Sequence, residues 1–325
     1  SHRYEQWGAD FFMSEPVTIK RGTEIELEIE SLAYGGMGLA RIENFVIFVK
    51  YAIPGQRVLA RIYKKRKGYA EAQVLETLVE SPNAVDVCCK HYWICSKIQS
   101  LSYDEQIKEK SSQVEDAFVR LGGFLNFKLD KVQKANLIYH YRNKMEFTFS
   151  PNRWVLESEP EGVDKSFALG LHIPGRFDKI LDIHNCHIQP EIGNKILAVA
   201  REVCLANPEL RPYDPRSHIG FLRFLMLRFG VNTGDLMVNV VTSYHDIDKL
   251  SPLTDLLLEK FPEITSLVNN VNTRKADVAF GEYETLLYGK PFIQEKIGGL
   301  TFEISANSFF QTNTTQGEVL YKEVE

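Results

Sequence analysis

The sequence predicts a mixed fold in which a small β-barrel is followed by an α+β domain. Two observations carry this prediction. Short strand-like runs, separated by glycine-, proline- and lysine-containing turns, fill residues 17–77, a pattern typical of small closed barrels of the OB type. In residues 78–300, strand-like and helix-like segments follow one another without regular alternation, which favours an α+β arrangement.

Composition and charge describe an ordinary globular protein. The 325 residues are 44% hydrophobic and 25% charged, with a net charge of -5 and a pI near 6.0. Five cysteines, an odd number, do not indicate a secreted disulfide framework. No run of about 18 apolar residues predicts a membrane span, so we expect a cytoplasmic protein. Residues 1–16 lack the apolar core of a signal peptide and read as a tag or a disordered extension.

The predicted barrel begins with "TEIELEIES" at residues 23–31, where apolar and glutamate side chains alternate with the period of a half-buried strand. The runs "NFVIFVK", "QRVLARIYK" and "YAEAQVLE" continue the pattern to an expected total of five strands, and the glycines of "AYGGMGLAR" read as a turn or bulge. Residues 17–75 contain ten Lys and Arg against six Glu, a balance of +4. The barrel is therefore basic within an acidic chain.

Four consecutive cations, Lys64, Lys65, Arg66 and Lys67, lie at a predicted loop between two of these strands. Clustered cations release counterions from a polyanion, so one interpretation is a loop that contacts nucleic-acid phosphates. The alternative is the solvated end of a hairpin with no binding role.

The α+β region opens with a helix whose limits are well marked. Ser102 and Glu105 have the spacing of a capping box, and Gly122 supplies the C-terminal stop. Further on, "MEFTFS" and the two halves of "FLRFLMLRFGVNTGDLMVNVVTS" read as strands. "PEIGNKILAVAREVC" reads as a helix with Cys204 in the core, and another helix is expected to begin at Ser251, with Pro252 in its first turn.

Cysteines are concentrated in one segment. Cys88, Cys89 and Cys95 fall within eight residues, and Cys186 follows much later. Thiolates bind iron–sulfur clusters or zinc, and a distant fourth ligand would tie the segment to the domain. The alternative is that these are buried thiols of a reduced protein. The nearby histidines read as structural residues rather than as ligands.

Aromatic and basic side chains are interleaved in "YHYRNKMEFTF". Tyr141, Arg142 and Lys144 offer a planar group for bases and cations for phosphates, as nucleic-acid surfaces do. A strand edge with a polar outer face explains the same pattern equally well. The chain contains no phosphate-binding loop and no dinucleotide fingerprint.

Two adjacent phenylalanines stand among amides in "ISANSFFQTN". Phe309 and Phe310 could both belong to the core. Asn307, Gln311 and Asn313 favour another interpretation, because an amide beside an aromatic ring can read the edge of an unstacked base.

Together with "YGGMGLARIENFVIFVKYAIPGQRV", "CKHYWIC" and "LGLHIPGRFDKILDIHNCHI", these last two segments resemble, in the same order, the RNA 5-methyluridine (uracil-C5) methyltransferases. The resemblance implies that residues 17–77 form a TRAM domain, an OB-like RNA-binding barrel. It also implies a Rossmann-like methyltransferase domain, whose nucleophilic cysteine and glutamate match nothing in this sequence. We therefore expect residues 301–325 to begin that domain, with the rest truncated away, no catalytic residue present and the chain inactive alone.

The resemblance also assigns residues and a cofactor. Gln311 matches a glutamine at the site of S-adenosylmethionine and the target base, and Phe309 matches an aromatic residue near the flipped uridine. In the implied chemistry a cysteine thiolate adds to C6 of the uridine, which makes C5 nucleophilic towards the methyl sulfonium. Many members carry a [4Fe-4S] cluster; Cys89, Cys95 and Cys186 match three ligand positions and Cys88 offers an extra thiol, but Ile98 replaces the remaining ligand.

RNA is the partner that the resemblance implies. The segments "YRNK" and "LGLHIPGR" favour the 23S ribosomal RNA branch over the transfer RNA branch. We expect the protein to be a monomer. A non-catalytic RNA-binding or ribosome-associated module is the alternative function.

Overall fold

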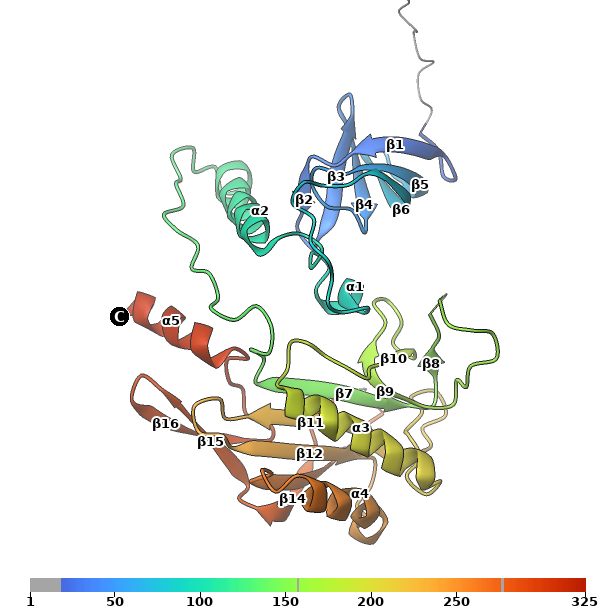
Figure 1. The fold of residues 1–325 in the computed structure, drawn as a ribbon, viewed down its shortest axis with the longest axis vertical. Coiled ribbons are helices and arrows are strands. Elements are labelled where there is room, and N and C mark those ends of the chain that lie inside the picture. The colour runs from blue at the N-terminus through green and yellow to red at the C-terminus, as the bar shows by residue number, and fades with distance from the viewer. Residues whose placement is uncertain (1–18, 157, 276–277) are drawn as a thin grey trace, which may run out of the picture. The chain divides into compact units, whose positions relative to one another are not determined.

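The computed structural model describes residues 19–156, 158–275 and 278–325, so the predicted extension at residues 1–16 lies outside the described part. The chain divides into two compact units, the first ending at Gln133 and the second spanning Lys134–Glu325 (Figure 1). The finer division at residues 77 and 300 stays a prediction.

One six-stranded sheet, in the order β1-β5-β6-β4-β3-β2, dominates the first unit. The alternation predicted for its first strand is confirmed, because Ile25 and Leu27 are buried and the glutamates between and beside them are exposed. The glycine-rich stretch contributes a hairpin of its own, which makes six strands instead of five. The strands are β1 (Glu24–Glu28), β2 (Ser31–Ala33), β3 (Met37–Ile42), β4 (Phe45–Lys50), β5 (Arg57–Lys65) and β6 (Tyr69–Val79).

Helices follow this sheet in the first unit. They are α1 (Tyr92–Cys95) and α2 (Tyr103–Asp116), and the latter continues as a π-helical turn, η1 (Ala117–Leu121). The predicted helix limits are confirmed, with Ser102 at the N-cap position and Gly122 at the C-cap position. Ser102 makes no side-chain cap hydrogen bond, so the predicted capping-box contact is not formed.

An eight-stranded mixed sheet, in the order β14-β13-β12-β11-β7-β9-β10-β8, forms the second unit (Figure 1). Its neighbours are antiparallel except for β12 with β13 and β10 with β8. The strands β11, β12 and β13 are buried along their whole length. The strands are β7 (Lys144–Ser150), β8 (Arg153–Trp154), β9 (Ala168–His172), β10 (Ile180–Asp182), β11 (Leu222–Phe229), β12 (Leu236–Thr242), β13 (Ser266–Val271) and β14 (Tyr283–Gly289).

Two helices, α3 (Glu191–Ala206) and α4 (Ile247–Lys260), lie side by side over one face of this sheet (Figure 1). Cys204 of α3 is buried, as predicted. A hairpin of β15 (Phe292–Ile297) and β16 (Leu300–Ser305) and the helix α5 (Thr314–Val324) complete the unit. In the part of the chain that the structure describes, no helix has the length and apolar character needed to cross a membrane.

The start of α4 was predicted at Ser251 and is wrong by one turn. The helix begins at Ile247, because Asp246 is the N-cap and its Oδ1 accepts a hydrogen bond from the Lys249 amide at 3.0 Å. Pro252 therefore lies inside the helix, where it cannot donate to the Asp248 carbonyl. The Ser251 hydroxyl donates to that carbonyl instead, at 2.9 Å.

The predicted fold class is wrong where it separates residues 301–325 from the α+β region as the beginning of another domain. Ile304 and Ala306 are buried in one cluster with Met237 of β12, Val268 of β13 and Ile293 of β15. The segment after residue 300 therefore completes the core of the second unit. Its strands are short and its loop is irregular, so the local sequence does not reveal this packing.

Candidate functional site

A hollow of about 180 Å³ lies in the second unit between β7 and the segment that follows β16. The structure brings three predicted residues, Arg142, Lys144 and Phe309, to this one place. The other two predicted residues of these segments, Tyr141 and Gln311, are partly buried beside lining residues. The lining residues are Arg142, Lys144, Glu146, Ser308, Phe309, Phe310 and Thr312.

Strand alternation explains why cations reach the hollow. Asn143 and Met145 are buried, whereas Arg142 and Lys144 on the other face of the chain are only partly covered. The Arg142 side chain is further fixed by a hydrogen bond from Nε to the Lys144 carbonyl, at 2.9 Å. The two cations are thus presented together at the start of β7.

The buried Arg228 of β11 holds one end of the loop that carries Phe309. Its Nε and Nη2 donate to the Ala306 carbonyl at 3.2 and 3.1 Å, and Nη2 also donates to the Ser308 carbonyl. Burial lowers the pKa of Arg228 to about 10, so the guanidinium stays charged at neutral pH. These charge-assisted bonds fix the backbone on one side of Phe309.

The buried Asn143 holds the other end of the same loop. Its Nδ2 donates to the Gln311 carbonyl and to the Thr314 hydroxyl, each at 2.8 Å, and its backbone amide donates to the Thr312 carbonyl at 2.9 Å. The Thr314 hydroxyl donates in turn to Glu295 at 2.8 Å. Residues 306–314 are therefore anchored on both sides without belonging to a strand or helix before α5.

Glu295 of β15 is fully buried and acts as a second anchor. Its Oε1 accepts from the amides of Asn232 and Lys296, each at 2.9 Å, and its Oε2 accepts from the Val231 amide and the Thr314 hydroxyl, each at 2.8 Å. Four donors satisfy a carboxylate that would otherwise be costly to bury. Sequence reasoning missed Glu295 and Arg228, although both interrupt otherwise apolar strand faces, a signal of a buried polar group with partners.

The two adjacent phenylalanines of the loop have different environments. Phe310 is partly buried, packs against the cluster of Ile293 and Ile304, and its ring centroid lies 5.8 Å from that of Phe302. Phe309 is 86% exposed. A large aromatic ring held in solvent by an anchored loop can stack on a planar ligand.

Two of the neighbouring amides have structural contacts. Asn313 is the N-cap of α5, with its Oδ1 accepting from the Gln316 amide at 3.1 Å, and Asn307 donates to Asn270 of β13 at 3.4 Å. Gln311 lies close to α5, where a Cβ at Gly317 would approach its Cβ to 3.3 Å. Of the three amides, Gln311 is the one that follows the two phenylalanines directly.

Electrostatics around the hollow favour an anionic ligand. The pKa of Lys144 is lowered, first by burial and then by repulsion from Arg228, with a smaller effect of Arg142. Glu146 opposes these effects. Three cations against one carboxylate, in a partly desolvated place, attract a phosphate more strongly than they would in open solvent.

Of the four consecutive cations predicted at a loop, Lys64 and Lys65 end strand β5, and Arg66 and Lys67 lie in the turn to β6. Lys64 forms an ion pair with Glu71, and its pKa is raised chiefly by this hydrogen bond. Lys65, Arg66 and Lys67 are exposed. The structure thus offers three exposed cations rather than four for contact with a polyanion.

The cysteines that the resemblance implies as cluster ligands have different environments. Ile98, at the position of the missing ligand, packs against the buried Leu32, Ile53 and Leu101. Cys88 and Cys95 are exposed, burial raises the pKa of Cys89, and Cys186, in the second unit, is buried. Among the described residues, no group of three or more His, Cys, Asp and Glu is arranged to hold a metal ion. Ile98 therefore leaves the cluster motif that the resemblance implies one thiol short, and the cluster stays a prediction.

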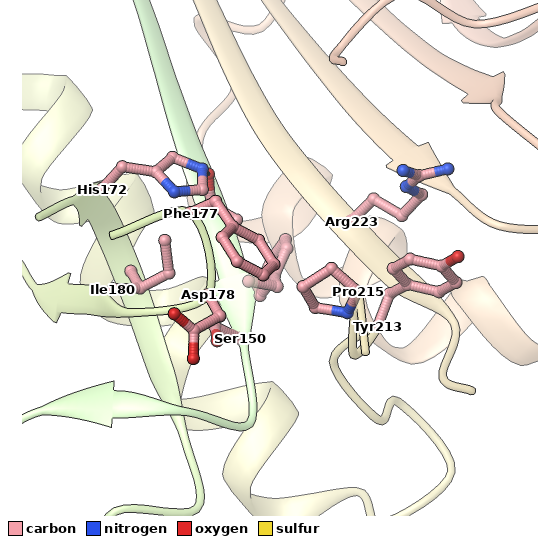
Figure 2. A pocket seen from close by; sticks show the side chains of 10 residues that line it. Ser150, His172, Phe177, Asp178, Ile180, Tyr213, Pro215 and Arg223 are labelled. Atoms are coloured by element: carbon pink, nitrogen blue, oxygen red, sulfur yellow. The ribbon is translucent and has the colours of Figure 1, made fainter. Parts of the chain in front are cut away.

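A second hollow, in Figure 2, has His172, Phe177 and Asp178 on one side and Tyr213 and Arg223 on the other. Its volume is about 10 Å³, which is close to the least that holds one water molecule. The Asp178 carboxylate already pairs with Arg216, and His172 lies 3.2 Å from the Thr148 hydroxyl. This hollow is too small for a nucleotide.

Comparison with known proteins gives a family context. Residues 19–75 match the TRAM domain. The chain is 39% identical over 306 residues to an uncharacterized RNA methyltransferase of Porphyromonas gingivalis, covering 91% of this chain and 65% of the relative. It is 41% identical over 278 residues to one of Chlorobaculum tepidum, covering 83% and 57%. The chain therefore spans about two thirds or less of the length of these relatives.

A solved structure has a similar fold. It is the Pyrococcus abyssi tRNA (uracil-54, C5)-methyltransferase in complex with S-adenosyl-L-homocysteine, with a TM-score of 0.67 and 23% identity over 92% of this chain and 64% of that chain. At this identity the likeness shows the fold alone. Because 92% of this chain matches this methyltransferase structure, the predicted fold class is corrected to the two units described above.

Proposed function

We propose that this relative of the RNA methyltransferases, which carries a TRAM domain at residues 19–75, takes part in the S-adenosylmethionine-dependent methylation of a uridine at C5 in RNA. The observation that carries the proposal is the hollow in which an exposed aromatic ring, Phe309, stands beside Arg142 and Lys144. S-adenosylmethionine, when bound, supplies an electrophilic methyl group.

In this proposal the residues of the hollow hold an unstacked nucleotide. Phe309 stacks on the uracil ring, and Arg142 and Lys144 bind the adjoining phosphates. Lys65, Arg66 and Lys67 of the TRAM domain contact the RNA backbone elsewhere. Because the loop of Phe309 is anchored by Arg228 and Asn143, little ordering is needed when the base binds.

Gln311 is proposed to contact the cofactor or the target base through its amide. The hollow of about 180 Å³ is smaller than the roughly 300–1,000 Å³ of pockets for drug-sized ligands, so its residues fit a base and not the whole cofactor. Burial raises the pKa of Cys204 to about 12, which excludes that thiol as a nucleophile at neutral pH.

For the target we propose 23S ribosomal RNA, supported by the resemblance of "LGLHIPGRFDKILDIHNCHI" to that branch. The test compares 5-methyluridine in purified 23S and transfer RNA from the parental strain, a strain lacking the gene, and strains with the Phe309→Ala or Phe177→Ala allele. Phe177 is a matched exposed phenylalanine, 68% exposed, outside the hollow. We expect deletion and Phe309→Ala to lower 5-methyluridine in 23S RNA, and Phe177→Ala to leave it unchanged.

Other outcomes of this test contradict the proposal in specific ways. Loss of 5-methyluridine from transfer RNA alone would assign the protein to the other branch. No change in either RNA after deletion would exclude the methylation proposal and favour the alternative of a non-catalytic RNA-binding module.

A further inference from the structure

A second exposed aromatic residue borders the hollow through a shared cation. Phe280, between β13 and β14, is 52% exposed, and the Lys144 ammonium lies 5.9 Å from the centroid of its ring. The same Lys144 lines the hollow with Phe309. Lys144 therefore lies beside the Phe280 ring and also lines the hollow.

The position of Phe280 is imposed by its neighbours. Ala279 is buried against Phe224, Met226 and Val241, which turns the next side chain towards solvent. Before it, the Val278 carbonyl accepts a hydrogen bond from Asn272 Nδ2 at 2.5 Å.

The backbone after Phe280 is fixed as well. A Cβ at Gly281 would lie 2.5 Å from Asn270 Oδ1, so this position tolerates only glycine. The next residue, Glu282, donates its amide to the Val271 carbonyl at 2.7 Å. Anchors on both sides keep the ring exposed, as the anchors around residues 306–314 do for Phe309.

We propose that Phe280 is a stacking site for the nucleotide adjacent to the one in the hollow, with the phosphate that joins the two nucleotides bound by Lys144. This inference rests on the proposed function and adds a second base-binding position to it. A cation beside a ring is compatible with a base on the ring and a phosphate on the cation, the usual pairing in single-stranded RNA sites.

The nearest acidic side chain in sequence, Glu282, forms an ion pair with Arg274 at 3.4 Å, which offsets part of its negative charge. Glu282 accepts hydrogen bonds from the amide and the hydroxyl of Thr273 and from Arg274 Nε, and these contacts lower its pKa. Tyr283, 50% exposed, extends the aromatic surface in the direction of β14.

The test measures the affinity of the 325-residue protein for a uridine pentanucleotide by fluorescence anisotropy, for the wild type and for Phe280→Ala, Phe280→Trp and Val278→Ala. Stacking on an aromatic side chain is worth about 5- to 150-fold in affinity. We expect that loss for Phe280→Ala, near wild-type affinity for Phe280→Trp, and no change for Val278→Ala, a neighbour that is 39% exposed. Equal thermal unfolding midpoints verify that the variants are folded.

Phe309→Ala separates this inference from the proposed function. If Phe309→Ala weakens binding and Phe280→Ala does not, the second stacking site is refuted and the hollow remains. If the wild type does not bind the pentanucleotide, or neither substitution weakens binding, both proposals are refuted.

Discussion

Two groups of cations, one in each unit, differ in how far their charged groups are exposed to solvent. At the turn from β5 to β6, Lys65, Arg66 and Lys67 are exposed and Lys64 is paired with Glu71. In the second unit, Lys144 and Arg228 are partly or fully buried and their pKa values are lowered by burial. Exposed cations are screened by salt and impose no geometry on a ligand, whereas buried cations are screened less and point in fixed directions.

This difference suits the two regions to different roles. Under the proposed function, the turn from β5 to β6 attracts RNA independently of its sequence, and the hollow holds one nucleotide in a defined orientation. Substitutions that remove charge from the two regions should therefore have different consequences.

The largest expected effect is on stability. Arg228→Ala leaves the carbonyls of Ala306 and Ser308 without their donor, so we expect the free energy of unfolding in urea to fall by about 3 kcal/mol. The matched substitution at the turn, Arg66→Ala, should change it by less than about 0.5 kcal/mol because the side chain is exposed. A similar small change for both would show that Arg228 does not anchor the loop.

The next effect is on salt dependence. Replacing Lys65, Arg66 and Lys67 with serine removes three exposed cations. At about 0.7 per phosphate contact, the slope of log affinity against log salt should become less steep by roughly 2, or about 15-fold in affinity between roughly 50 and 200 mM salt. Filter binding to a structured RNA fragment at several salt concentrations measures this slope.

Lys64→Ser is the control for that series, because Lys64 is already paired with Glu71. The Lys64→Ser substitution should change the slope of log affinity against log salt by less than a single substitution of Lys65, Arg66 or Lys67. If all variants keep the wild-type slope, the turn is only the solvated end of a hairpin.

The smallest effect is on pH dependence. The folded pKa of Lys144 lies below its unfolded value, chiefly through burial, so the unfolded chain binds more protons between the two values and stability rises with pH in that alkaline window. RNA affinity should fall a few-fold as pH rises through the lowered pKa, because the neutral amine no longer attracts phosphate. In Lys144→Arg this fall should disappear.

The pKa of Lys64 is shifted in the opposite direction to that of Lys144. Its folded pKa is raised by Glu71, so the stability that it contributes is fully present below the unfolded pKa and is lost as pH rises through the folded pKa. A Lys64→Arg variant should therefore leave the fall in RNA affinity unchanged. If Lys144→Arg behaves in the same way, Lys144 does not contact the RNA.

Periodic patterns predicted the parts of the fold that local sequence determines. The strands β7, β11 and β12 and the helix α3 were found from their apolar patterns, and Arg142 and Lys144 were singled out from the interleaving of cations and aromatic residues. In contrast, Asp246 and Ser251 are both good N-cap residues, so the local signal could not decide where α4 begins. The glycines before β3 were interpreted as a turn or bulge, so the short strand β2, which pairs with β3, was not predicted as a separate strand.

The parts of the site that depend on distant contacts could not be read from the sequence. Nothing local distinguishes Phe309 from Phe310, because one is exposed and the other packs near Phe302 only after the hairpin of β15 and β16 has formed. The apolar strand faces around Arg228 and Glu295 indicate buried polar groups but do not identify their partners. Their role depends on carbonyls and amides that lie many residues away.

The contact between the start of β7 and the loop before α5 also makes the hollow depend on completion of folding. Asn143 and Thr314, which join the two sides of the hollow, are 171 residues apart in the chain. Closing so long a loop has a large entropic cost that is recovered only when the intervening strands have assembled. A nascent or misfolded chain therefore lacks the hollow, so the proposed binding of a base requires a folded second unit.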